Sequence, residues 1–137
     1  MAYVFKEGDL PSLVDAKQAR ERIFFVNQEL AKIDDMLAGV MHYKQGAASP
    51  LHLHKNCEHF YFIIDGKATV ESDDGIRSVG PGDMIFIPAE EKHRLRATTP
   101  LFYFEWQAPN RFKTTILEGT DDDGRWDRKD GRVWIQT

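Results

Sequence analysis

The chain has 137 residues, 42% of them hydrophobic and 29% charged, a size and balance typical of one folded domain rather than of a disordered or fibrous chain. Its formal net charge of −4 offers no general attraction for nucleic acid or for an anionic membrane, so neither is an expected partner. The start lacks a secretion signal, no apolar run has transmembrane length, and the single Cys57 cannot form an intramolecular disulfide. We therefore expect a cytoplasmic protein.

Strand signals outnumber helix signals along the chain. One short helix is predicted within Leu10–Asp15, with Ser12 as its N-cap and Asp15 three residues later. The expected strands are apolar, β-prone runs at 23–26, 37–43, 60–64, 67–71, 84–87 and 101–106. Glycine-containing turn pairs separate the later runs, at 65–66, 74–75 and 81–82. Many short strands with turns between them predict an all-β sandwich or small barrel.

Four of the five histidines fall into one short cluster and one later position, namely His52, His54, His59 and His93. A neutral imidazole carries a nitrogen lone pair at pH 7, so clustered histidines provide what a divalent transition metal requires. Residues i and i+2 of a strand point to the same side, so His52 and His54 would face one interior if this stretch is extended. The remaining His42 lies outside the cluster and is interpreted as a packed or exposed residue.

The spacing around these histidines resembles the two motifs of the cupin family. The first motif spans about 46–66 and the second about 82–97. The matching residues are Gly46, His52, His54 and Gly66 in the first motif and Gly82, Pro88 and His93 in the second. The resemblance implies a cupin double-stranded β-helix, a jelly-roll barrel formed by a single domain over 1–137, with a short N-terminal helix and a C-terminal extension over 110–137. It also implies a homodimer.

The chain departs from the family pattern at three positions. Where the first motif usually has a glutamate, Glu58 and His59 compete, and counting six residues back from Gly66 reaches His59. Because the side chains of a strand alternate, both cannot point inward. We assign His59 as the ligand and keep Glu58 as the fallback. In the second motif Glu90 replaces a glycine and Ala97 replaces an asparagine.

A set of four neutral imidazoles leaves the +2 charge of a metal ion intact, which favours anionic, enolate-like or catecholate-like ligands. Nitrogen-rich coordination suits Fe, Ni, Cu, Zn or Mn better than Mg or Ca. An octahedral ion would keep two positions free for a small-molecule substrate. The resemblance and the ligand set together predict a metal-dependent enzyme acting on a small oxygenated organic molecule, as a dioxygenase or an enolate-type isomerase. The alternative is a non-catalytic small-molecule or sugar-binding or sensing cupin with a structural metal.

No general base stands out, and the candidates for catalytic residues are Tyr61, which shares the side of His59, and Glu105. In the run 101–107, Phe102, Phe104 and Trp106 form one face, an aromatic stripe suited to lining an apolar cavity. Such stripes more often serve packing than recognition, although the two roles overlap in a small barrel.

The flanks of the second motif and the tail give weaker signals. If His93 faces inward, Leu95 and Ala97 follow it, while Arg94 and Arg96 turn outward as surface charges. In the tail, Trp126 and Trp134 need apolar contact, so this segment is expected to cover the outside of the barrel or a neighbouring subunit. The acidic run 120–124 is interpreted as a solvated turn, and Cys57 as a small loop residue.

Overall fold

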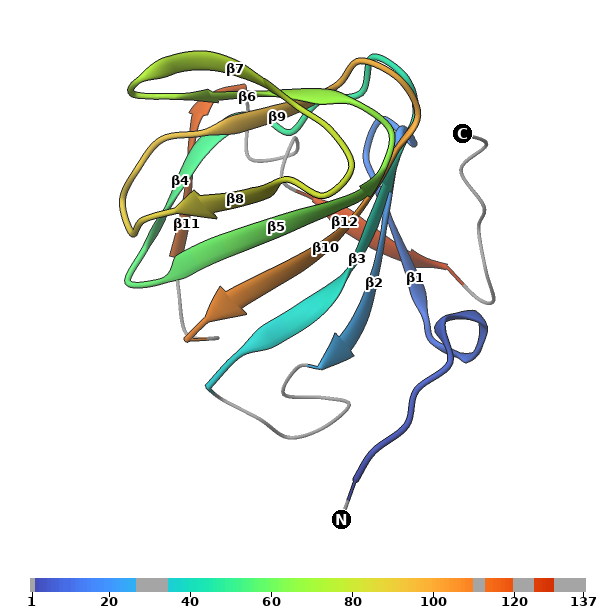
Figure 1. The fold of residues 1–137 in the computed structure, drawn as a ribbon. Coiled ribbons are helices and arrows are strands. Elements are labelled where there is room, and N and C mark those ends of the chain that lie inside the picture. The colour runs from blue at the N-terminus through green and yellow to red at the C-terminus, as the bar shows by residue number, and fades with distance from the viewer. Residues whose placement is uncertain (1, 27–34, 110–112, 120–124, 130–137) are drawn as a thin grey trace.

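A computed structural model describes residues 2–26, 35–109, 113–119 and 125–129. The structure is nearly all β, as predicted (Figure 1). The elements are the 3₁₀ turn η1 (Glu7–Asp9) and the strands β1 (Ser12–Asp15), β2 (Arg20–Val26), β3 (Leu37–Tyr43), β4 (Leu51–Lys55), β5 (Glu58–Asp65), β6 (Ala68–Ser72), β7 (Gly75–Val79), β8 (Met84–Ile87), β9 (Arg94–Ala97), β10 (Leu101–Ala108), β11 (Lys113–Glu118) and β12 (Trp126–Lys129).

The strands pair antiparallel in three sheets. The long sheet has the order β12-β1-β2-β3-β10-β5-β8, a second sheet pairs β11 with β4, and a third has the order β7-β6-β9. Figure 1 shows the layer of β6, β7 and β9 facing the β5 and β8 side of the long sheet, with β4 and β11 at one end. This arrangement is the predicted jelly-roll barrel.

The core lies between these layers and follows the alternation of each strand. On β5, Tyr61 and Ile63 are buried on the side of His59, and on β9, Leu95 and Ala97 are buried while Arg96 is exposed. These assignments confirm the predictions made by parity, except that Arg94 is only 19% exposed and forms ion pairs with Glu71 and Glu118. The main cluster comprises Met41, Tyr43, Ala47, Tyr61, Ile63, Ala68, Val70, Ile85, Ile87, Leu95, Ala97, Leu101 and Tyr103.

The predicted helix within Leu10–Asp15 is wrong, because Ser12–Asp15 forms strand β1 between β2 and β12. Instead of capping a helix, the Ser12 hydroxyl donates to the Glu21 carboxylate on β2 at 2.5 Å. Asp15, the last residue of β1, accepts a hydrogen bond from the Arg20 side chain at the start of β2. A helix of a few residues is marginal unless packing supports it, and here two neighbouring strands supply backbone partners. The only helical piece near this position is η1.

The aromatic stripe does not line the cavity, and its packing interpretation is confirmed. Phe104 and Trp106 lie on the outer face of β10, each 36% exposed, and Trp106 stacks on Phe60 with ring centroids 5.1 Å apart. Two of the inward positions of β10 are polar, because β10 pairs with β5 in a register that sets Gln107 opposite His59 and Glu105 opposite Tyr61. The interior of the barrel at this level is therefore built for hydrogen bonding.

The turn that closes the first motif requires its glycine. Gly66 has φ +86°, and a Cβ built there would meet the Pro100 carbonyl oxygen at 2.0 Å. This close approach fixes the β5–β6 turn against the start of β10.

The tail prediction is tested only in part, because Trp126 lies in β12, while Trp134 and the acidic run 120–124 lie outside the described residues. Among the described residues, no helix has the length and apolar character needed to cross a lipid bilayer. Homodimer formation stays a prediction.

Candidate metal centre

The two sequence motifs meet through a backbone bridge between His52 and His93. The N–H of His52 donates to the His93 carbonyl at 3.1 Å, and the N–H of His93 donates to the His52 carbonyl at 2.8 Å. This antiparallel bridge brings the two imidazole rings to a centroid separation of 4.2 Å. Residues 41 positions apart in the chain thus share one site because their segments pair through the backbone, with a second bridge between Ala48 and Arg96.

Three histidines converge in the barrel interior. His52 and His54 are buried on the same face of β4, as the i, i+2 spacing predicts, and His93 is 1% exposed. One ring nitrogen of each of these histidines lies within 4.8 Å of the others. The three side chains can therefore reach a common ion.

The outward nitrogens of the three rings are held by the surrounding chain. Nδ1 of His52 donates to the Pro50 carbonyl at 2.7 Å, and Nδ1 of His93 donates to the Glu91 carbonyl at 3.0 Å. These hydrogen bonds leave the lone pair on Nε2 of each ring, the arrangement found around metal-binding histidines. Nε2 of His93 is buried and has no hydrogen-bond partner among the described residues, so its environment fits a metal ion.

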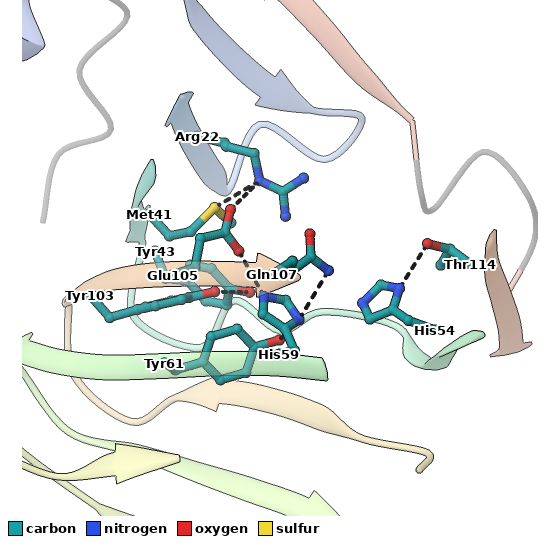
Figure 2. A network of polar contacts seen from close by, with 10 residues as sticks. All are labelled: Arg22, Met41, Tyr43, His54, His59, Tyr61, Tyr103, Glu105, Gln107 and Thr114. Carbon is teal, nitrogen blue, oxygen red and sulfur yellow. Dashed lines mark hydrogen bonds and ion pairs between the residues drawn. The ribbon is translucent and has the colours of Figure 1, made fainter. Parts of the chain in front are cut away.

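The third ring, His54, is held from β11. Its Nδ1 lies 2.9 Å from the Thr114 hydroxyl, a contact that joins the two-stranded sheet to the site (Figure 2).

The three histidines are neutral at pH 7. Burial lowers the pKa of His52 to about 4, and burial with the neighbouring His52 lowers the pKa of His93 to about 3. The pKa of His54 is lowered as well, by burial first and then by the other histidines. Neutral imidazole is the form that binds metal, so the cluster needs little proton release before binding.

His59 lies beside the three rings, but other residues engage both of its nitrogens (Figure 2). Nε2 contacts the Glu105 carboxylate at 3.2 Å, while the Tyr61 hydroxyl and the Gln107 side-chain amide each approach Nδ1, at 3.1 and 3.2 Å. The role of His59 as fourth ligand stays a prediction, and it would require Nδ1 to exchange these contacts for the metal. Glu58, the fallback, is exposed on the opposite face of β5.

Glu105 lies at the centre of a buried charge network. Its carboxylate is 2.9 Å from Nε of Arg22 on β2 and also contacts His59. Burial opposes ionisation of Glu105, but the positive charge of Arg22 outweighs it and holds the pKa of the carboxyl below its usual range. The ionised carboxylate therefore accepts the Nε2 proton of His59. Glu105 lies behind His59 and is not among the residues that line the cavity, and its catalytic role stays a prediction.

A cavity of about 310 Å³ is lined by His52, His54 and His59, and Tyr61 is also part of its wall. Burial raises the pKa of the Tyr61 hydroxyl well above its usual range, so it stays a hydrogen-bond donor. The lining also includes Arg20, Arg22 and Trp126, which sequence reasoning did not assign to the site. The i, i+2 spacing of the arginines in a strand is the one signal that could have placed them on a single face.

Two other residues lie outside this chemistry. Cys57 is buried in the loop before β5, where burial and the neighbouring Glu58 raise the pKa of its thiol to about 11, so it is a poor nucleophile. His42 stacks on Phe102, with ring centroids 4.4 Å apart, and contacts Glu7. Its predicted place outside the site is confirmed.

Residues 39–106, about half of the chain, match the family model described as "Cupin domain". Solved structures with the same fold include the polyketide cyclase RemF from Streptomyces resistomycificus (TM-score 0.73, 20% identity, 90% of each chain covered) and KdgF from Halomonas sp. (0.70, 20%, 81% of this chain and 96% of that one). Oxalate decarboxylase from Bacillus subtilis also matches (0.70, 22%, 85% of this chain), although this chain spans only 33% of that protein. No curated protein matches significantly. The chain is a small cupin-type protein.

Proposed function

We propose that this protein is a metal-dependent enzyme acting on a small oxygenated organic molecule, as a dioxygenase or as an isomerase that works through an enolate. The observation that carries the proposal is the convergence of three buried, neutral imidazoles, whose ring nitrogens lie within 4.8 Å of one another. Two of them, His52 and His54, line a cavity of about 310 Å³. A purely structural site usually closes the shell of its ion, whereas a catalytic site keeps positions open to a cavity.

His52, His54 and His93 would hold the ion, with His59 as the predicted fourth ligand. Such an ion, Fe, Ni, Cu, Zn or Mn, would polarise oxygen atoms of the substrate and, if redox-active, support reaction with dioxygen. The structural relative oxalate decarboxylase is described as having Mn(II) centres, which supports a metal at the corresponding place in this barrel. Tyr61 would donate a hydrogen bond to a substrate oxygen from the cavity wall once its hydroxyl is released from Nδ1 of His59.

Metal replacement tests the proposal. The protein is stripped with a chelator, reloaded with each ion in turn, and assayed against catechols, diketones and uronates for oxygen uptake and for isomerised product. We expect turnover with at least one ion, loss of that turnover in His93→Gln, and retention in His42→Gln, the matched histidine outside the site. Turnover that survives chelation would refute metal dependence, and binding without any turnover would favour the sensing alternative.

A further inference from the structure

We propose that the substrate is a small organic acid and that Arg22 binds its carboxylate. This inference rests on the proposed function, because the remainder of the molecule must reach the histidine cluster. It concerns the part of the cavity formed by β2 and β12, away from the metal ligands.

Arg20 and Arg22 point to the same face of β2, and both line the cavity with the histidines. They differ in their exposure to the cavity. Arg20 is buried and binds Asp15 through Nε at 2.8 Å. Arg22 is 23% exposed, and within the described part of the chain its polar contacts run through Nε, to Glu105 at 2.9 Å and to the Met41 sulfur at 3.1 Å.

The terminal nitrogens of Arg22 are therefore available for a ligand. Figure 2 shows them on the side of the guanidinium that points away from Glu105. A guanidinium presents its donors as a planar fork that matches the two oxygens of a carboxylate. Arg20 is 4% exposed, so of the two arginines only Arg22 presents an accessible guanidinium to the cavity. A single accessible fork suits a carboxylate better than a phosphate with three oxygens to satisfy.

The fork is held in place before any ligand arrives. The Arg22 guanidinium carbon lies 4.4 Å from the ring centroid of Trp126 and 5.3 Å from that of Phe24. Its Nε is fixed by Glu105, which is 1% exposed. A side chain that is already ordered loses little rotamer freedom on binding, so more of the interaction energy contributes to affinity. Trp126 thereby gives β12 a role in the site.

The charge balance and size of the cavity agree with this substrate class. The histidines are neutral, and each arginine has one carboxylate partner, Asp15 for Arg20 and Glu105 for Arg22. A bound divalent ion would leave the site positive, which favours an anion. The volume of about 310 Å³ lies at the small end of ligand pockets, which run from roughly 300 to 1,000 Å³.

The test compares acids with their neutral amides, such as lactate with lactamide and pyruvate with pyruvamide. Binding is measured by calorimetry on the full chain, both metal-free and loaded with Zn²⁺. Carboxylates also bind metal ions directly, so the decisive comparison is between the wild type and Arg22→Gln. We expect Arg22→Gln to weaken acid binding about 10- to 100-fold, the range for a lost charge-assisted hydrogen bond, and to leave amide binding within about twofold.

The control is Arg96→Gln, which removes an equal charge from an exposed position on β9 outside this cavity, and which should bind acids as the wild type does. Because Arg22→Gln leaves buried Glu105 unpaired, the double variant Arg22→Gln/Glu105→Gln keeps the network neutral. Arg22→Lys keeps the charge without the fork and should bind acids with intermediate affinity.

Equal acid binding by Arg22→Gln and the wild type, or equal loss for acids and amides, would overturn the proposal, as would tighter binding of inorganic phosphate than of the acids. The measurement is separate from catalysis. An Arg22-dependent preference for acids without metal-dependent turnover would support the carboxylate site and refute the proposed enzyme. Metal-dependent turnover without that preference would support the enzyme and refute the carboxylate site.

Discussion

The metal-free protein should lose stability steeply as the pH falls below 6.5, the ordinary pKa of histidine. In the unfolded chain His52 and His93 take up a proton near that pH, whereas in the folded chain burial lowers their pKa values to about 4 and about 3. The unfolded state therefore binds more protons, and each histidine weakens folding by about 1.4 kcal/mol per pH unit below 6.5 until its folded pKa is reached. At pH 5 the two together cost about 4 kcal/mol, a large part of a typical stability of roughly 5–15 kcal/mol.

Urea unfolding of chelator-treated protein at several pH values between 5 and 7.5 measures this dependence. The interval is chosen because most carboxylates titrate below it. The variant His93→Gln should reduce the slope by about 1.4 kcal/mol per pH unit, since it removes one of the groups. A free energy of unfolding that stays constant from pH 7.5 to pH 5 would refute the reasoning, because it would mean that these rings accept protons in the folded state.

Three substitutions test other parts of the account. Gly66→Ala should destabilise the protein by about 3 kcal/mol or more in urea unfolding, since its Cβ would meet the Pro100 carbonyl oxygen at 2.0 Å, and a loss below about 1 kcal/mol would contradict that packing. Glu90→Gly should raise the free energy of unfolding by about 0.5–1 kcal/mol, because Glu90 has φ +69° in the left-handed region, which glycine adopts without strain. A lower urea midpoint for this variant would contradict the strain at Glu90. Thr114→Val should weaken metal binding about 10- to 100-fold by calorimetry, through its lost contact with His54, while Thr114→Ser should retain it; equal affinities would show that the contact does not support the ligand.

Sequence patterns were enough to predict the three histidines that converge in this site. The parity of His52 and His54 depends only on the strand that contains them, and the resemblance to the cupin motifs supplied the link to His93. The structure gives that link a physical basis in the backbone bridge between His52 and His93. The departure at Glu90 also has a structural meaning, because its left-handed backbone is the conformation that glycine adopts most easily.

What the sequence could not reveal depends on pairings between distant segments. Ser12–Asp15 carries a helix-start pattern, and only its pairing with β2 and β12 makes it a strand. The inward face of β10 follows from its register with β5, which turned Glu105 inward and Trp106 outward. Arg22 and Trp126 come from distant parts of the sequence and meet at the cavity, and no local sequence pattern around either residue predicts that contact.

Metal binding by three imidazoles inside the barrel is the hypothesis on which the rest depends. It can be tested by calorimetric titration of the metal-free protein with Zn²⁺ or Mn²⁺, followed by X-ray absorption spectroscopy of the loaded protein. We expect one ion per chain, with at least three histidine nitrogens in its coordination shell. Binding should be lost in His93→Ala and unchanged in His42→Ala. A fourth nitrogen that disappears in His59→Ala would establish His59 as a ligand. An ion that binds equally well without His93, or a coordination shell without histidine nitrogen, would show that the histidine cluster is not the metal site.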